Sequence, residues 1–225
     1  MQITVFGATG RVGSRVVDQA AQRGFDVKAI SHNGTSHAHS KVTTVQADVL
    51  KDDLTDALEG SSAVVSCLGV GNDPATLFDP PPLYTKGTLR IAGAMKVASI
   101  DRLIVVSATF VETLDRGPAH FQATLPALSM VFKQMEDMEA QLTRLDNLRW
   151  TAVRPGWIMD ADPSPDAVIT DRVIREDLIR SRTGDIAKLM LDAVENDQWI
   201  NEKPAVASPE DDEHTSVKAV VQEIV

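Results

Sequence analysis

Residues 7–13 read Gly7-Ala8-Thr9-Gly10-Arg11-Val12-Gly13 and directly follow the short apolar stretch 2–6. This order predicts a strand, a tight glycine turn and a helix that begins near residue 11. Such a turn suits a pyrophosphate, because the start of a helix supplies unpaired N–H donors to an anion. Gly7 permits the turn, Gly10 keeps side-chain atoms away from the phosphate, and Gly13 allows close helix packing. The stretch therefore predicts a dinucleotide-binding turn, with GxxGxxG spacing.

Outward from this turn, strand-like and helix-like segments alternate, which indicates a parallel sheet with helices on both faces. The expected strands are 2–6, 26–30, 42–46, 62–66, 102–107 and 150–154. The expected helices are 11–23, 51–58, 83–99 and 127–146. The prediction is an α/β fold: a Rossmann-like, doubly wound, mainly parallel sheet flanked by helices, in a single NAD(P)-binding domain over residues 1–225.

Three irregular stretches follow strand ends, where ligands bind in open α/β sheets, so we expect substrate-side loops around 71–82, 108–126 and 155–184. The proline-rich stretch 71–82 is either one wall of the mouth or a stiff connector. A helix is expected to start at Thr183-Gly184-Asp185 and to run to about residue 196, with Thr183 or Asp185 as its cap. A last helix is expected over 215–224, and the acidic run before it complements the helix dipole.

Composition limits the partners and the compartment. The chain has 225 residues, with 22 Lys and Arg against 32 Asp and Glu, a net charge of −10. An acidic chain disfavours nucleic acid as a partner, and no apolar run is long enough for a membrane helix. The single cysteine, Cys67, excludes an intrachain disulfide. With a strand in place of a signal peptide after Met1, we expect a cytoplasmic protein that binds neither nucleic acid nor membrane.

The end of the second expected strand bears on the coenzyme. NAD-specific sites place a carboxylate there for the ribose 2′-OH, but this chain has Ser31, His32 and Asn33. Together with Arg11 these side chains offer donors or charge to a 2′-phosphate, so NADP(H) is preferred over NAD(H). Asp48 either accepts from the adenine amino group or caps the helix at 51–58. His32, His37 and His39 lie in a polar loop, and we expect no metal site.

Several segments together resemble the atypical short-chain dehydrogenase/reductase superfamily, in its NmrA-like NAD(P)H-binding branch, and within it the flavin reductase/biliverdin IXβ reductase type. The resemblance rests on the glycine turn together with Ala47-Asp48-Val49, Thr85-Lys86-Gly87-Thr88, Val105-Val106-Ser107-Ala108, Thr151-Ala152-Val153-Arg154-Pro155-Gly156 and Asp185-Ile186-Ala187. It implies NADP(H) along the carboxyl edge of the sheet and a substrate cleft above the nicotinamide. It also implies that Ser107, Pro155 and Gly156 lie near that ring.

The chain departs from the family at the acid dyad. Better-known members carry Tyr-x-x-x-Lys on the helix before the Arg-Pro-Gly strand, and the corresponding positions here are Phe132 and Glu136. The only tyrosine, Tyr84, lies far upstream. Hydride transfer without the dyad suits an acceptor that is already electrophilic, since conjugation stabilises the added electron pair. We therefore expect an NADPH-dependent oxidoreductase acting on a flat conjugated small molecule, such as a flavin, a quinone or a tetrapyrrole.

Other side chains receive expected roles around this chemistry. Ser107 and Thr109 are weak proton donors, and Phe110 and Trp157 either contact the flat substrate or cap the core. Helix 127–146 presents one apolar face, with Glu136 and Glu139 on another, solvated side. The cofactor-binding residues expected from the turn, the strand ends and the resemblance are Gly7, Thr9, Gly10, Arg11, Val12, Gly13, Ser31, His32, Asn33, Asp48, Val49, Leu68, Gly69, Ser107, Pro155 and Gly156.

The loss of the dyad fits one alternative equally well. A non-catalytic NADP(H)-binding redox sensor of the NmrA-like kind would bind the coenzyme and regulate a protein partner, with no need for tyrosine or lysine.

Overall fold

The computed structural model describes residues 1–34, 36–71, 76–77, 79–115, 119–122, 125–211 and 214–216. Its main sheet has the strand order β3-β2-β1-β4-β5-β6-β10-β8. The neighbours from β3 to β10 pair in parallel, and only β8 pairs antiparallel, on β10. The predicted Rossmann-like, mainly parallel sheet is therefore confirmed. The strands are β1 Gln2–Phe6, β2 Asp26–Ser31, β3 Val42–Gln46, β4 Ala63–Ser66, β5 Arg102–Val106, β6 Arg149–Pro155, β8 Val168–Thr170 and β10 Ala205–Ala207.

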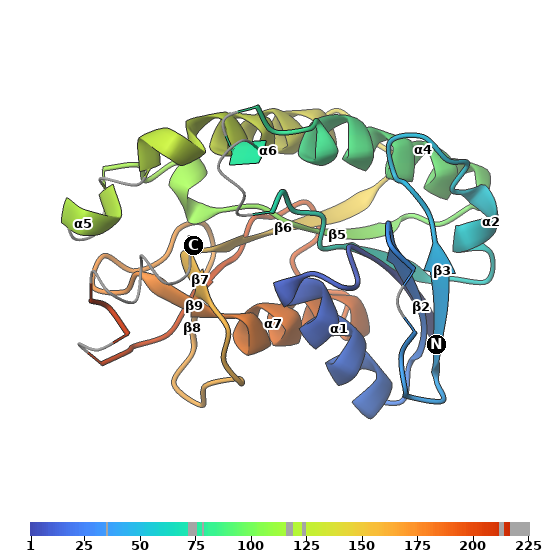
Figure 1. The fold of residues 1–225 in the computed structure, drawn as a ribbon, viewed down its shortest axis with the longest axis horizontal. Coiled ribbons are helices and arrows are strands. Elements are labelled where there is room, and N and C mark those ends of the chain that lie inside the picture. Colours follow the sequence, from blue (N-terminus) through green and yellow to red (C-terminus); the bar gives the residue numbers. More distant parts are fainter. Residues whose placement is uncertain are drawn as a thin grey trace.

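Helices cover both faces of this sheet, as Figure 1 shows. Helices α1 (Arg11–Gln22) and α7 (Thr183–Glu195) pack together on one face, with Val16, Ile186 and Met190 in the shared core. Helices α2 (Thr55–Leu58), α4 (Thr88–Val97) and α6 (Ser129–Leu142) lie on the other. Strands β4 and β5 lie between the two layers and are buried along their whole length, as their continuous apolar runs predict.

Some expected helices are shorter than predicted. The helix expected over 51–58 is only α2, whose first amide, on Thr55, donates to Asp53 Oδ1 at 2.9 Å. The helix expected from 83 begins as a π-helix, Leu83–Gly87, before α4. Short helical turns also occupy Thr109–Val111, Ala119–Gln122 and Leu125–Leu128.

The region 155–184 holds more order than predicted. It contains β7 (Trp157–Met159) and β9 (Arg180–Arg182), which pair in parallel as a small second sheet, and it contains β8. Helix α7 begins at Thr183 with no side-chain cap. Asp185 instead accepts from the Ser164 amide at 2.7 Å and from the Ser208 hydroxyl at 2.5 Å, which ties this region to β10. The expected helix 215–224 lies outside the described residues, apart from its first two.

Helix α6 differs from the prediction at one position. Its apolar face packs on the core as predicted, and Glu136 is exposed, but Glu139 is only 2% exposed. Glu139 Oε1 accepts from Arg154 Nε at 2.9 Å and from the Ser107 hydroxyl at 2.6 Å. Burial would raise the pKa of Glu139, but hydrogen bonds from Arg154 and Ser107 outweigh it and hold this pKa below its ordinary value. A buried carboxylate therefore joins α6 to β6 and to the end of β5.

This arrangement predicts unequal effects for two glutamates on one helix. Glu139→Ala leaves the fully buried Arg154 guanidinium without its main partner, so unfolding free energy should fall by about 3–5 kcal/mol. Glu136→Ala, which loses only an exposed pair with Lys133, should change it by less than about 0.5 kcal/mol. Urea unfolding followed by circular dichroism measures both, and equal effects would contradict the buried pair.

The lowered pKa of Glu139, paired with Arg154, also determines how the unfolding free energy changes in acid. A carboxyl whose folded-state pKa is lowered stabilises the protein above its unfolded pKa, near 4.3, and loses that stabilisation as the pH falls through the folded value.

The described residues include no helix with the length and apolar character needed to cross a bilayer.

Candidate functional site

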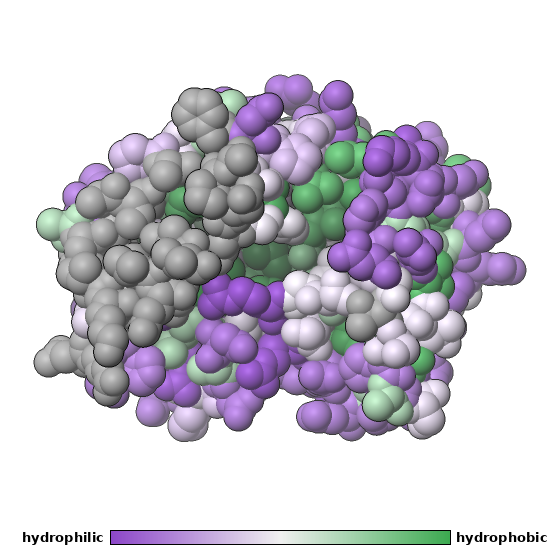
Figure 2. Space-filling view, in the orientation of Figure 1, coloured by the Kyte–Doolittle hydropathy of each residue, from purple (hydrophilic) through white to green (hydrophobic). Residues whose placement is uncertain are grey.

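A cavity of about 1050 Å³ opens where β1, β4, β5 and β6 end at their carboxyl edge. Figure 2 shows the hollow near the middle of this face, with apolar residues inside it. The glycine turn and the ends of β2 and β3 line one half, and residues from the π-helix, α6 and β7 line the other. This position is the one at which Rossmann-like sheets bind dinucleotides.

The glycine turn is built as predicted. Gly7 has a φ of +69°, and a Cβ there would lie 2.4 Å from the Cys67 carbonyl oxygen. A Cβ on Gly13 would lie 2.0 Å from the Gly7 carbonyl oxygen, so this glycine holds the helix against the turn. Helix α1 has neither a capping side chain nor an acid in its first turn. Its first amides therefore suit the diphosphate of a dinucleotide.

Most residues expected at the site do line the cavity. They are Gly7, Thr9, Gly10, Arg11, Val12, Ser31, His32, Asp48, Val49, Leu68, Gly69, Ser107, Phe110, Pro155, Gly156 and Trp157. Three do not. Gly13 has only the packing role described above, and Asn33 is exposed in the loop after β2. Thr109 is fully buried, where its hydroxyl accepts from the Ile174 amide at 3.3 Å, so it offers no proton to a ligand in the cavity.

The ends of β2 and β3 form the polar end of the cavity. Asp48 Oδ1 accepts from the Leu50 amide at 2.9 Å, and Lys51 Nζ lies 2.9 Å from Asp48 Oδ2. The hydrogen bond from Lys51 is the main reason that the pKa of Asp48 lies below its ordinary value. His32 Nδ1 lies 3.8 Å from the same carboxylate. Asp48 lines the cavity in a turn of its own and does not cap α2, which begins seven residues later, at Thr55.

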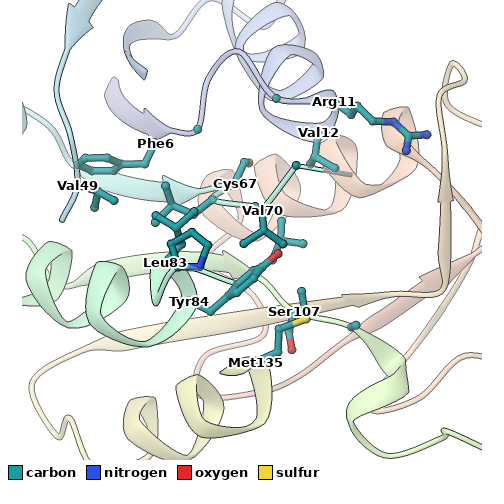
Figure 3. A pocket seen from close by; sticks show the side chains of 18 of the residues that line it. Phe6, Arg11, Val12, Val49, Cys67, Val70, Leu83, Tyr84, Ser107 and Met135 are labelled. Carbon is teal, nitrogen blue, oxygen red and sulfur yellow. The ribbon is translucent and has the colours of Figure 1, made fainter. Parts of the chain in front are cut away.

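One expected cation, Arg11, lies elsewhere than predicted, and one cation that was not predicted, Lys51, lines the cavity. Arg11 points away from the ends of β2 and β3, as Figure 3 shows, and its Nη2 donates to the Ile158 carbonyl at 3.3 Å. It therefore lies away from the other expected 2′-phosphate donors, because β7 borders the opposite half. Lys51, which the sequence reasoning missed, lines the cavity on the side where Arg11 was expected to act. The sequence feature that could have identified Lys51 is its position three residues after Asp48.

The other half of the cavity is apolar and partly aromatic. Phe110 lies 5.4 Å from Phe132 and 6.3 Å from Trp157, measured between ring centroids. All three rings are nearly buried and line the cavity, so Phe110 and Trp157 serve both the core and the site. Phe132, at the position where the sequence comparison with the dyad expected a tyrosine, lines the cavity and has no proton to give. From the stretch 71–82, Gly71, Leu77 and Pro81 also line this half, which favours the mouth-wall prediction.

Ser107 is not the free donor that was expected. It is 1% exposed, and its hydroxyl proton is donated to Glu139 Oε1 at 2.6 Å. Because that carboxylate is held by Arg154, the serine proton stays directed at α6. Among the described residues, no group of three or more His, Cys, Asp or Glu side chains could hold a metal ion.

Tyr84 is the second residue that sequence reasoning missed. It is 6% exposed, and Figure 3 shows its ring reaching from the π-helix toward Val70. Burial raises the pKa of its hydroxyl to about 12, against a smaller lowering by a hydrogen bond with the Val70 backbone. The phenol is therefore neutral at physiological pH. Its distance in sequence from the expected dyad hid it, although it directly follows the proline-rich stretch.

The reactivity of the Cys67 thiol tests whether this part of the cavity wall is closed to solvent. Cys67 lies behind the glycine turn, and burial raises the pKa of its thiol to about 12. Thiol reagents attack the thiolate, so Ellman's reagent should leave the native protein unmodified near pH 8. The chain's single thiol should react fully once guanidinium chloride has unfolded the protein. Rapid modification of the native protein would show that this wall of the cavity is open.

Known proteins share this pattern. A family described as NAD(P)H-binding matches residues 7–197. A chloroplastic protein of Arabidopsis thaliana is 27% identical over 179 residues, which cover 75% of this chain and 63% of that protein. This chain thus spans less than two thirds of the Arabidopsis relative. The protein YwnB of Bacillus subtilis is 23% identical over 223 residues, which cover 92% of this chain and 99% of YwnB.

Two solved structures share the fold. The oxidoreductase ylbE of Lactococcus lactis superposes with a TM-score of 0.76 at 20% identity, over 100% of this chain and 99% of that one. A candidate NADH-flavin reductase of Streptococcus pneumoniae superposes with a TM-score of 0.72 at 23% identity, over 93% of this chain and 100% of that one. The fold is Rossmann-like, and the chain belongs to the NAD(P)H-binding family.

Proposed function

We propose that this member of the NAD(P)H-binding family is an NADPH-dependent oxidoreductase that reduces a flat, conjugated acceptor. The observation that carries the proposal is the cavity itself: a glycine turn fit for a diphosphate opens directly into an apolar, aromatic-lined half. Residues of both halves belong to one continuous space, so a coenzyme and a flat acceptor can lie against each other. The flavin reductase named among the structural neighbours supports this class of acceptor.

The residues suit a reaction without an acid dyad. When bound, the coenzyme would supply the hydride. The protein's part is to hold the acceptor between Phe110, Trp157 and Met135 and to keep water away from it. Phe132 and the engaged hydroxyl of Ser107 supply no proton, so the acceptor itself must stabilise the added electron pair.

We infer a preference for NADPH from the polar end of the cavity. Neither Ser31 nor His32 is a carboxylate, and Lys51 adds a cation beside them. A 2′-phosphate placed there meets Lys51 as well as the Ser31 hydroxyl, whereas the adenine would approach Asp48.

The first test is oxidation of NADPH with lumiflavin, menadione and biliverdin as acceptors. At least one should be reduced, and Gly13→Ala should abolish that activity, because the added Cβ would lie 2.0 Å from the Gly7 carbonyl oxygen. Gly93→Ala is the matched control, since a Cβ on that glycine of α4 meets no atom within 4 Å among the described residues. No turnover with any acceptor, in protein that binds NADPH, would refute the proposed reaction and favour the redox-sensor alternative.

A second prediction concerns the coenzyme. Lys51→Ala should weaken NADPH binding about 10-fold and leave NADH binding nearly unchanged, because only NADPH carries the 2′-phosphate. Lys41→Ala removes the same charge from an exposed lysine outside the cavity and should change neither. Titration calorimetry measures all six pairs, and an equal loss for both coenzymes would place Lys51 elsewhere than at the 2′-phosphate.

A further inference from the structure

The charged side chains that line the cavity are unevenly distributed. Among the described residues they are Arg11, His32, Asp48 and Lys51. All four belong to the glycine turn or to the segments after β2 and β3. Arg11 is also directed at β7, where Asp160 and Asp162 already pair with Arg15. The rim on that side therefore carries balanced charge.

The acceptor half, which is the apolar half of the cavity, receives one cation among the described residues: Arg11, whose guanidinium donates to the Ile158 carbonyl at the β7 rim. Its described wall consists of Val70, Leu77, Pro81, Leu83, Phe110, Leu128, Phe132, Met135 and Trp157. A phosphate or a carboxylate placed among these side chains would lose its hydration without gaining a partner, which is strongly unfavourable. Flavin nucleotides carry phosphate and linear tetrapyrroles carry propionates, whereas simple quinones carry no charge. The wall therefore discriminates among the acceptors by charge.

The Tyr84 hydroxyl in this half can donate a hydrogen bond to a ligand. Ser107 donates its proton to Glu139, whereas no described residue accepts a hydrogen bond from the Tyr84 hydroxyl. The Val70 backbone hydrogen bond lowers the Tyr84 pKa and thus stabilises the phenol oxygen as an acceptor, which leaves the O–H available. The ring lies beside the segment 68–70, where a Cβ on Gly69 would be 3.7 Å from the hydroxyl.

We propose that the acceptor is an uncharged, lipophilic quinone, and that the Tyr84 hydroxyl donates a hydrogen bond to the carbonyl oxygen that gains negative charge on reduction. This inference rests on the proposed NADPH-dependent reaction and narrows its acceptor. The raised pKa keeps Tyr84 protonated throughout, so it acts as a hydrogen-bond donor and not as the final acid.

The reaction balances with one proton from water. A C–H bond of the reduced nicotinamide would break, and the hydride would form an O–H bond at one quinone carbonyl oxygen, which leaves the negative charge on the other oxygen. The quinone becomes a hydroquinone monoanion, whose charged oxygen is the one that Tyr84 contacts. A solvent proton then completes the hydroquinone, so NADPH, quinone and H⁺ yield NADP⁺ and hydroquinone.

The exclusion of charged acceptors is tested with a matched pair of quinones, menadione and 1,4-naphthoquinone-2-sulfonate. The sulfonate withdraws electrons and makes its ring easier to reduce, so chemistry alone favours the charged compound. We expect kcat/KM for menadione to be higher by at least about 100-fold, from the cost of burying the sulfonate. Riboflavin and FMN form a second pair that differs by one phosphate.

The role of Tyr84 is tested by removing its hydroxyl and by tuning it. Tyr84→Phe should lower kcat/KM for menadione about 10- to 100-fold without changing the Kd for NADPH. Thr143→Val, which removes an exposed hydroxyl at the end of α6, should change neither. Because Tyr84 is the only tyrosine, growth on fluorotyrosines replaces this position alone and lowers its pKa stepwise. Activity should then be lost with rising pH at each analogue's own pKa, which a packing role would not produce.

The same fluorine reports binding without turnover. In the presence of NADP⁺, the single ¹⁹F resonance should shift with menadione and not with the sulfonate. Absence of NADPH oxidation with every acceptor would refute the proposed function itself. Equal use of menadione, the sulfonate and FMN would leave that function standing and overturn the quinone assignment. An unaffected Tyr84→Phe variant, with no ¹⁹F shift, would overturn the role of Tyr84.

Discussion

The carbonyl oxygen of Gly7 is the point against which the first helix is fitted. A Cβ on Gly13 would approach it to 2.0 Å, and a Cβ on Gly7 would approach the Cys67 carbonyl oxygen to 2.4 Å. Strand β1, helix α1 and strand β4 therefore converge at a distance that only glycine permits. This convergence directs the first amides of α1 into the cavity and sets where a diphosphate would lie. The positions of both halves of the cavity follow from it.

The charged groups behind the cavity wall differ from those that line the cavity. The buried Arg154–Glu139 pair lies behind the acceptor half, with Lys203 Nζ at 3.1 Å from Glu139 Oε2 and Glu112 at 2.8 Å from Arg154. These groups satisfy one another and present no charge to the cavity. The pair holds the end of β5, β6 and α6 in place while the lining stays apolar. Among the described residues, the charged side chains that line the cavity belong to the glycine turn and to the segments after β2 and β3.

The sequence predicted features that depend on local pattern. Residues 63–65 and 104–106 are continuous apolar runs within strands, and the three glycines of the turn are recognisable from their spacing alone. Features that depend on distant partners were missed. From the sequence Glu139 is expected on the solvated side of its helix, but β6 brings Arg154 beside it. Strands β7 and β9 have three residues each and are formed by pairing between distant segments. Tyr84 reaches the site from the π-helix and Lys51 from the turn after β3, and no periodicity in the sequence reveals either position. The direction of Arg11 depends on its contact with β7.

The stretch between β6 and α7 leaves the sheet at Gly156 and returns to it as β8, the antiparallel edge. Both of its ends are fixed by the core, while Trp157 and Ile158 face the cavity. This excursion also contacts the glycine turn and its helix, because Arg11 donates to the Ile158 carbonyl and Arg15 pairs with Asp160 and Asp162. One segment thus contributes to the apolar half of the cavity and also braces the helix that follows the glycine turn, so its replacement would change both.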